Sequence, residues 1–264
     1  RITKKSFKKW IKIGNFSKII FNKISLCLCS NKETVGFLKK LGAKNIKYFG
    51  NLKYAQSENE KIEINKKIKK LILSKKTWCA SSTHADEEKF CGLVHKELKK
   101  KYKNLLTIII PRHIDRVNEI ENELKKLNLK IYFHDSKLQL EKDVDIYIVD
   151  AYGKTRSFFN YCKNVFLGGS IINHGGQNPL EAARYGCNIL HGPNTYNFKE
   201  IYNFLKKNKI SQKINSEEQA VKLLDKYFTK KQNFKIIQKK INSIGQKILE
   251  NTYKEVRLIL KNEI

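Results

Sequence analysis

Four short segments carry polar or glycine residues at places where the sequence predicts the end of a β-strand. They are Ser81-Ser82-Thr83-His84, Pro111-Arg112-His113, Asp150-Ala151-Tyr152-Gly153-Lys154 and a glycine-rich run over residues 168–181. Ligands of an open α/β sheet bind outside the carboxyl ends of its strands, so chemistry is expected in these loops. Arginine side chains and the free N–H groups at helix starts are groups that bind phosphate.

The glycine-rich run is the most specific of the four segments. Gly168, Gly169 and Ser170 follow one predicted strand, and the run from Gly175 to Glu181 (GGQNPLE) opens the next helix. Glycine lets a backbone approach a ligand closely, and a helix start favours an anion. The carboxylate of Glu181, one turn into this helix, can accept both hydroxyl groups of a ribose. The run is typical of nucleotide-sugar sites, and its alternative is a glycine turn with an acid placed for the helix dipole.

The other three segments carry weaker signals. The planar guanidinium of Arg112 suits a phosphate, and a surface salt bridge is its alternative role. Thr83 with Asp86 fits a helix N-cap pattern, which explains Thr83 but leaves His84 unexplained. Gly153 would let the backbone approach a ligand, although one glycine after a strand is weak support for a site.

Short β-branched runs alternate with longer amphipathic stretches, a pattern typical of an α/β domain with a parallel sheet. The apolar run at residues 105–110 indicates a strand that is buried on both faces. Further strands are expected at residues 78–81, 130–133, 144–149, 165–167 and 188–190. Helices are expected at residues 61–73, 86–102, 115–127 and 155–162, and from residues 179, 198, 216 and 234.

The first 50 residues predict only the end of another domain. They contain an expected helix at residues 7–21, strands at 24–29 and 46–49, and a helix at 32–41 that Gly42 ends. We therefore expect three parts: residues 1–50 from the end of an incomplete first domain, residues 51–232 as a Rossmann-like domain, and residues 233–264 as a helix that crosses back toward the first domain. Methionine is absent from the chain, which leads us to expect that it is part of a longer product.

The charge of the chain is strongly positive, at a formal net +29, and residues 1–55 alone carry +13. Such a basic segment suits an anionic membrane surface. A nucleic-acid partner is a weaker alternative, because no recognition motif accompanies the lysines. No apolar run approaches the roughly 18 residues of a membrane-spanning helix. The six cysteines form no CxxC pair and no zinc spacing, and are expected to be small core residues in a reducing cytosol.

Taken together, these segments resemble the 3-deoxy-D-manno-octulosonic acid (Kdo) transferase family. The matching pieces lie in the family's order at residues 42–54 (GAKNIKYFGNLKY), 81–88 (SSTHADEE), 108–116 (IIIPRHIDR), 165–186 (VFLGGSIINHGGQNPLEAARYG) and 191–201 (HGPNTYNFKEI). The resemblance implies a two-domain GT-B glycosyltransferase that moves Kdo from CMP-Kdo to a lipid A precursor, lipid IVA, in lipopolysaccharide core biosynthesis. It also implies a peripheral place at the cytoplasmic face of the bacterial inner membrane.

The resemblance assigns roles to individual residues. Lys53 would stabilise the transition state, and no metal or other cofactor is expected, because cations and helix starts would stabilise the leaving phosphate and no Asp-x-Asp motif is present. The CMP part of the donor would be held by Ser82, Thr83, His84, Pro111, Arg112, His113, Tyr152, Gly153, Lys154, Gly169, Ser170, Gly176, Gln177, Asn178, Pro179, Leu180 and Glu181.

Three departures from the family pattern stand out. Lys154 occupies the place of a usual glutamate, Gln177 the place of a histidine, and Ala85-Asp86 the place of Glu-Gly. The family's general base, a glutamate near the start of the first domain, has no counterpart in this chain. We therefore expect the chain alone to bind donor poorly or moderately and to transfer little sugar unless the missing half is supplied. The alternatives are a GT-B glycosyltransferase for a UDP-sugar, a non-catalytic donor-binding fragment and a basic nucleic-acid-binding protein.

Overall fold

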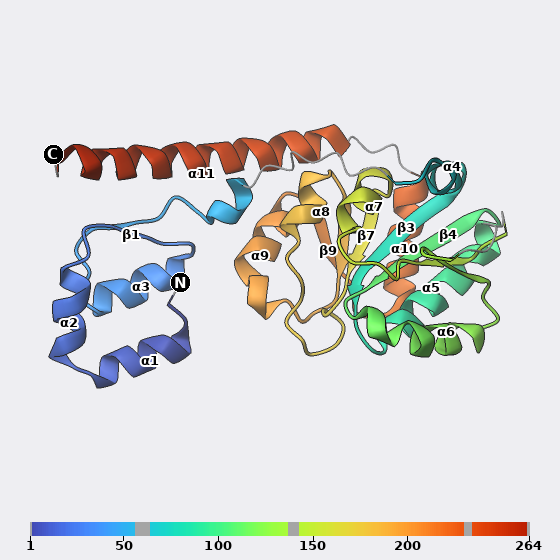
Figure 1. Ribbon diagram of the computed structural model, residues 1–264, viewed down its shortest axis with the longest axis horizontal. Coiled ribbons are helices and arrows are strands. Elements are labelled where there is room, and N and C mark those ends of the chain that lie inside the picture. Colours follow the sequence, from blue (N-terminus) through green and yellow to red (C-terminus); the bar gives the residue numbers. More distant parts are fainter. Residues whose placement is uncertain (1, 56–63, 137–142, 230–233, 263–264) are drawn as a thin grey trace. The chain divides into compact units, whose positions relative to one another are not determined.

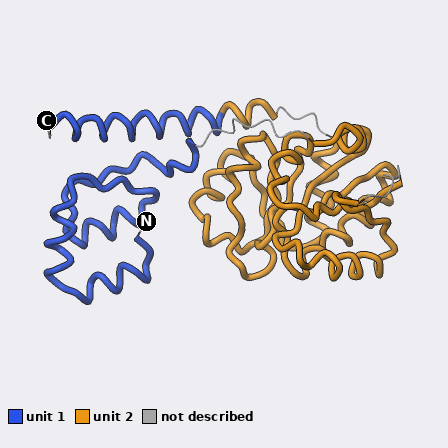
Figure 2. Tube along the Cα trace, in the orientation of Figure 1, with its two compact units in different colours: residues 1–57, 240–264 blue, residues 58–239 orange. Residues whose placement is uncertain are grey.

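A computed structural model describes residues 2–55, 64–136, 143–229 and 234–262 of the chain. It contains two compact units, Arg1–Ser57 with Lys240–Ile264 (unit 1) and Glu58–Lys239 (unit 2), which Figure 2 shows in blue and orange. The domain limit expected after residue 50 stays a prediction. The limit expected after residue 232 lies outside the described residues.

Unit 2 is built on a seven-stranded sheet in which every strand pairing is parallel. The strand order is β5-β6-β4-β3-β7-β8-β9, and the α/β class expected from the sequence is confirmed (Figure 1). Every residue of the interior strand β4 is buried, as its largely apolar sequence predicted. The strands are β3 (Lys76–Thr83), β4 (Leu105–Pro111), β5 (Ile131–Phe133), β6 (Ile146–Ile148), β7 (Asn164–Leu167), β8 (Asn188–His191) and β9 (Ser211–Lys213).

The helices of unit 2 cover the sheet, and α5 to α9 lie in the connections between its strands. Helix α5 contacts α6 and α10, whereas α7 contacts α4 and α8. Right-handed crossovers that run in opposite directions from β3 place these two groups on opposite faces. The helices are α4 (Lys66–Ser74), α5 (Glu87–Lys101), α6 (Val117–Lys125), α7 (Thr155–Tyr161), α8 (Leu180–Arg184), α9 (Lys199–Lys207) and α10 (Glu217–Thr229).

Two local expectations for unit 2 are corrected. Thr83 does not cap α5: it ends β3, and the helix begins at Glu87 after Asp86, whose side chain makes no capping hydrogen bond. The strand β9 was not expected, because its sequence Ser211-Gln212-Lys213 is polar. It pairs with β8 only and so lies at the edge of the sheet, where a polar strand is tolerated.

Unit 1 contains a small parallel sheet of β1 (Cys27–Leu28) and β2 (Ile46–Lys47) with α1 (Lys4–Lys12), α2 (Asn15–Asn22) and α3 (Lys32–Lys40). The single helix expected at residues 7–21 is wrong, because Gly14 has φ +59 and separates α1 from α2. Thr3 starts α1 with a capping box shared with Ser6.

The last helix, α11 (Phe234–Asn262), packs against the short 3₁₀ helix η1 (Leu52–Ala55) of unit 1. Gly245 lets the helix approach closely, since a Cβ there would stand 2.1 Å from the carbonyl oxygen of Tyr54. A Cβ on Gly50 would likewise stand 2.6 Å from Ile248, a buried residue of the same helix. This close packing accounts for Gly50 and Gly245.

All six cysteines are buried and unpaired, which agrees with their expected place in the core. None of the helices in the described part of the chain has the length and apolar character needed to cross a bilayer. Within the same residues, no group of three or more His, Cys, Asp or Glu side chains is arranged to hold a metal ion.

Candidate ligand site at the carboxyl edge of the sheet

The strand order of unit 2 reverses at β3, which lies between β4 and β7. The chain goes from β3 to β4 on one side, and from β7 to β8 on the other. In such sheets the ligand crevice opens outside the carboxyl ends of the strands at this reversal, which is called the switch point of the sheet. The loops after β3 and β7, which contain His84 and the glycine-rich run, flank that position.

Glu87 joins these two loops. Its carboxylate is fully buried and accepts hydrogen bonds from the backbone N–H groups of Gly169 (2.6 Å), Ser170 (3.0 Å), Ile171 (3.0 Å) and His84 (3.1 Å). These are the N–H groups that a phosphate would otherwise use in a glycine-rich loop. The 168–171 turn is therefore built around a carboxylate of the protein, and a ligand anion must bind elsewhere at the edge.

His84 lies where the two loops meet. Its Nε2 stands 3.3 Å from the amide nitrogen of Gln177, and its ring lies 4.3 Å from the ring of His174. Gly169 leaves room for these side chains, since a Cβ there would stand 3.2 to 3.4 Å from His174, Gln177 and His84. The side chains of His84 and Gln177, predicted from separate segments, are thus neighbours.

The electrostatic environment of His84 is positive. Its pKa is lowered to about 4 by burial first, and then by the positive charges of His174, His113, Arg112 and Arg116. His84 is consequently neutral at pH 7, and its Nε2 can accept a hydrogen bond from the Gln177 amide. Burial disfavours a charge of either sign, whereas the cations of Arg112 and Arg116 near His84 favour an anion such as a phosphate.

The Pro-Arg-His segment is tied directly to the His84 loop. Pro111 pairs with Thr83 at the end of the sheet, and the N–H of Arg112 donates to the carbonyl oxygen of Thr83 over 2.9 Å. The side chains of Arg112 and His113 are exposed, and the His113 ring lies 5.8 Å from the His84 ring, edge to face. Two cationic or protonatable groups are thereby placed beside the switch point.

Residues 175–181 are shaped by the segment after β8. Gly175 and Gly176 both have positive φ, and a Cβ on either would collide with, or press against, residues 194–197. Asn178 accepts a hydrogen bond from the N–H of Leu180 at the start of α8, and Tyr202 donates its hydroxyl hydrogen to the carbonyl oxygen of Gln177 over 3.0 Å. Pro179 precedes α8 as its N-cap. The conformation of the run is therefore supported by contacts within the protein.

Glu181 is paired with Arg156. The Nε of Arg156, in the first turn of α7, stands 2.6 Å from Oε1 of Glu181, and each side chain is 31% exposed. A half-exposed carboxylate held by an arginine can still accept hydroxyl groups from a ligand with its outer lone pairs. Its expected role toward a ribose stays a prediction.

The remaining predicted residues lie in different surroundings. Tyr152 and Gly153 are exposed, Gly153 has φ +76, and Lys154 precedes α7, which carries Arg156. Ser170 is fully buried, and its hydroxyl accepts the N–H of Gly192 and donates to the carbonyl oxygen of Leu167. Ser82 has φ +55 at an irregularity in β3. Ser82 and Ser170 thus shape the backbone of the edge.

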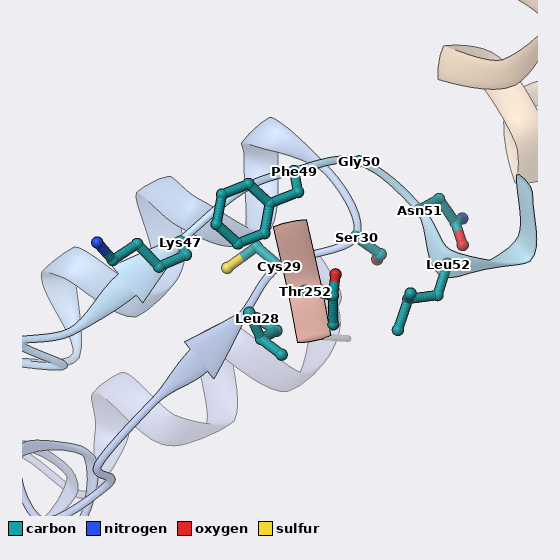
Figure 3. Close-up of a pocket in the computed structure, with 9 residues that line it drawn as sticks. All are labelled: Leu28, Cys29, Ser30, Lys47, Phe49, Gly50, Asn51, Leu52 and Thr252. Atoms are coloured by element: carbon teal, nitrogen blue, oxygen red, sulfur yellow. The ribbon is translucent and has the colours of Figure 1, made fainter. Parts of the chain in front are cut away.

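Lys53, predicted to stabilise the transition state, belongs to unit 1. It lies in η1 and its N–H donates to the side chain of Asn51. A pocket of about 100 Å³ adjoins it at the carboxyl ends of β1 and β2. Figure 3 shows the pocket lined by side chains from both strand ends and by Thr252 of α11, with Leu28, Phe49, Asn51 and Leu52 among them.

Four residues at the edge of the unit 2 sheet were not singled out from the sequence: Glu87, Arg156, His174 and Tyr202. Glu87 lies inside the quoted SSTHADEE segment, and its early place in a helix was the available signal. His174 lies between the two glycine pairs, where a histidine near a ligand loop can be suspected. Arg156 and Tyr202 carry no local signal, because their partners stand about 25 residues away in the sequence.

Comparison with known proteins identifies relatives of the whole chain. Residues 1–56 match a family described as 3-Deoxy-D-manno-octulosonic-acid transferase (kdotransferase). The 3-deoxy-D-manno-octulosonic acid transferase of Rickettsia felis is 32% identical over 231 residues, which cover 84% of this chain and 48% of that protein. The enzyme of the same name from Rickettsia prowazekii is 28% identical over 97% of this chain and 55% of its own length. The chain thus spans about half the length of these curated relatives.

Solved structures show the same fold. The C-terminal CMP-Kdo binding domain of WaaA from Acinetobacter baumannii matches with a TM-score of 0.58 at 21% identity, over 67% of this chain and 91% of that domain. Anabaena HepE in complex with UDP matches with a TM-score of 0.53 at 11% identity, over 97% of this chain and 68% of HepE. The fold is that of GT-B glycosyltransferases, as expected. Sequence and fold agree, and this chain belongs to the 3-deoxy-D-manno-octulosonic acid transferase family.

Proposed function

We propose that unit 2 binds CMP-Kdo at the carboxyl edge of its sheet and that the chain serves the transfer of Kdo to a lipid A precursor. The donor's CMP phosphate would bind beside Arg112 and His113, and its ribose beside Glu181. The acceptor would be lipid IVA, and the place of reaction the cytoplasmic face of the bacterial inner membrane.

The observation that carries this proposal is the group of basic side chains around His84 at the switch point, Arg112, Arg116, His113 and His174. When a CMP-sugar donates its sugar, CMP leaves as a phosphate monoester. The negative charge of its phosphate grows as the bond to the sugar breaks. Cations fixed beside that phosphate stabilise the transition state more than the ground state. Arg112 follows β4 directly, its backbone N–H donates to the carbonyl oxygen of Thr83, and its positive charge acts on His84.

Calorimetric titration of the full chain with CMP and with UDP tests the donor assignment. We expect CMP to bind more tightly, and Arg112→Ala to weaken it by about ten- to a hundredfold, because a hydrogen bond between charged groups is lost. Arg257→Ala, which removes an arginine from α11 in unit 1, should leave the affinity for CMP unchanged. Preference for UDP would favour another GT-B glycosyltransferase, and no binding of either nucleotide would reject the site.

Transfer itself is tested separately, with CMP-Kdo and lipid IVA as substrates. We propose that Lys53 stabilises the departing phosphate, so Lys53→Ala should lower even the small rate of Kdo transfer expected of this chain, while CMP still binds to unit 2. A chain that binds CMP but forms no Kdo-lipid product would act as a donor-binding module only. The two measurements therefore separate the binding proposal from the catalytic one.

A further inference from the structure

We propose that His174 and Gln177 bind a carboxylate of the donor sugar, and that His84 positions Gln177 for this contact. The side chains of these residues meet at the carboxyl edge of the unit 2 sheet. The donor sugar is accordingly a sugar acid whose carboxylate lies on the anomeric carbon, next to the phosphate. This inference rests on the proposed CMP site, and it adds to that site a second subsite for an anion.

Two side-chain nitrogens lie close together beside Gly169. A Cβ on this glycine would stand 3.2 Å from Nδ1 of His174 and 3.3 Å from the amide nitrogen of Gln177. The same amide nitrogen is 3.3 Å from Nε2 of His84, whose ring lies 4.3 Å from the ring of His174. The imidazole of His174 and the amide of Gln177 are therefore near enough to each other to donate to the two oxygens of one carboxylate.

His84 orients the amide of Gln177. Because His84 is neutral at pH 7, its Nε2 accepts one hydrogen of that amide, and the amide nitrogen carries a second hydrogen that it can donate to a ligand. The backbone of Gln177 is held as well, since its carbonyl oxygen accepts the hydroxyl hydrogen of Tyr202 over 3.0 Å. His84 thus acts on the ligand through Gln177, as a positioning residue.

The loop that carries His174 is held by the segment after β8. The side-chain amide of Asn197 donates to the carbonyl oxygen of His174 over 3.2 Å, and the backbone N–H of Asn197 donates to the carbonyl oxygen of Gly175. Tyr196 donates its hydroxyl hydrogen to the carbonyl oxygen of Asn173. The imidazole of His174 is exposed, so a ligand can reach it. Supporting His174 gives the segment after β8 a role in the donor site.

The chemistry of the proposed donor requires two anion subsites side by side. Kdo is a 2-keto sugar acid, so the anomeric carbon of CMP-Kdo carries both the carboxylate and the oxygen that leads to the phosphate. The phosphate is proposed to bind beside Arg112 and His113, and the ring of His113 lies 5.8 Å from the ring of His84. His84 is thus a neighbour of both His113 and His174, which matches the short distance between the two anions. A donor with a neutral sugar offers His174 no such partner.

The methyl ester of CMP-Kdo tests the carboxylate alone, because it keeps the nucleotide and the sugar but lacks the negative charge. Calorimetric titration of the full chain should show that CMP-Kdo binds about tenfold more tightly than this ester, since charge-assisted hydrogen bonds are lost. The ratio of the two affinities should fall to about threefold or less in His174→Ala and in Gln177→Ala.

Three further variants make the test specific. His174→Arg should keep the ratio near that of the parent chain, because a guanidinium also suits a carboxylate. Asn173→Ala is the matched control: it removes the exposed polar side chain next to His174, and it should leave the ratio unchanged. His84→Ala should lower the ratio in the parent chain but not further in Gln177→Ala, since His84 acts through Gln177. Circular dichroism verifies that each variant is folded.

Several results would overturn the inference. They are equal binding of CMP-Kdo and its ester to the parent chain, and a ratio that His174→Ala and Gln177→Ala leave unchanged in folded protein. If CDP binds more tightly than CMP and His174→Ala removes that gain, the second anion is a phosphate and the carboxylate is rejected. Titration of the parent chain with CMP separates the two proposals. Normal CMP binding without discrimination against the ester rejects the carboxylate subsite alone, whereas an absence of CMP binding rejects the proposed function as well.

Discussion

The carboxylate of Glu87 accepts the backbone N–H of Gly169 at 2.6 Å, and this contact joins the two loops that flank the switch point of the sheet. Glu87 stands at the start of α5, so the helix after β3 holds the turn after β7. Three further N–H groups converge on the same two oxygens. The glycine turn is thus fixed by the protein itself, and His84 is fixed with it.

Glu87→Gln should therefore destabilise unit 2 and weaken CMP binding together. The glutamine amide would present N–H groups to backbone donors that now meet a carboxylate, at a cost of about 3 kcal/mol in the free energy of unfolding. Urea denaturation followed by the fluorescence of Trp78 measures the first effect, and titration with CMP measures the second.

Glu97→Gln supplies the control for that measurement. Glu97 lies on the same helix but is exposed and pairs with Lys100 at the surface, so its loss should change stability by less than about 0.5 kcal/mol. If both substitutions lower the free energy of unfolding equally, the four N–H groups that converge on Glu87 add no measurable stability.

Gly168 should tolerate no side chain. A Cβ on Gly168 would stand 2.4 Å from the carbonyl oxygen of Ser82 and 2.8 Å from the carboxylate of Glu87, which would separate the ends of β3 and β7. We expect Gly168→Ala to lower stability by about 3 kcal/mol. Gly36→Ala in α3 is the opposite case: no atom lies within 4 Å of its added Cβ, so it should stabilise by about 0.5 to 1 kcal/mol. Urea denaturation followed by circular dichroism compares the two variants.

The strands and their loops were predictable because their signals are local. The apolar run of β4 indicated burial on both faces, and the segments after β3, β4 and β7 stood out by glycine, arginine and histidine at strand ends. The split of the first helix was missed because the alternation of apolar side chains continues across Gly14, whose positive φ breaks the helix.

The contacts that complete the site could not be predicted in the same way. Glu87 and Gly169 are 82 residues apart, and the sequence around either residue does not indicate that the other is its partner. Arg156 and Glu181 pair only because α7 and α8 pack together. Such contacts depend on the order of the strands, which the sequence pattern leaves open until the sheet is known.

Asp145 should be important for stability at the opposite, amino-terminal edge of the sheet. It is buried just before β6, where Lys99 and the N–H of Lys130 donate to it and His95 Nε2 lies 3.4 Å away. Burial favours the neutral form of Asp145, but these hydrogen bonds outweigh it and hold its pKa below the usual value. Asp145→Asn should cost about 3 kcal/mol at pH 7, because Lys99 loses its partner.

Asp143 provides a control two residues away. It is exposed and pairs with Lys130, so Asp143→Asn should change the free energy of unfolding far less than Asp145→Asn does. Since the folded pKa of Asp145 is depressed, its stabilisation is present above its unfolded pKa of about 4 and is lost as the pH falls below that value. The difference between Asp145→Asn and the parent chain should therefore shrink between pH 5 and pH 2, and a constant difference would contradict the ionised state.

His84 should make the chain less stable in mild acid. Its pKa falls from about 6.5 in the unfolded chain to about 4 in the folded one, so the unfolded state binds more protons between these values. The contribution of the neutral His84 to the free energy of unfolding is therefore fully present above pH 6.5 and declines as the pH falls toward 4. His191, whose pKa is also lowered to about 4 by burial, contributes in the same window.

The imidazole of His84 can be followed by proton NMR during an acid titration. We expect a midpoint near pH 4 in the free chain, and His84→Gln should reduce, without removing, the loss of stability between pH 6.5 and pH 4. A bound phosphate would add negative charge beside the ring, so saturating CMP should raise the midpoint. If saturating CMP leaves the titration midpoint of His84 unchanged, the phosphate binds away from His84.

Glu181 should distinguish ribose from deoxyribose. If its carboxylate accepts the ribose hydroxyl groups, CMP should bind about tenfold more tightly than 2′-deoxy-CMP, since one charge-assisted hydrogen bond is lost with the 2′-hydroxyl. Glu181→Gln should weaken CMP binding and bring the two affinities close together.

Arg156→Gln, which releases the carboxylate from its 2.6 Å ion pair, should weaken CMP binding by a smaller factor, because Arg156 only orients Glu181. Glu250→Gln on α11 of unit 1 should leave both affinities unchanged. A tenfold preference for CMP that survives in Glu181→Gln would assign the ribose to another residue of the edge and leave Glu181 as the partner of Arg156 alone.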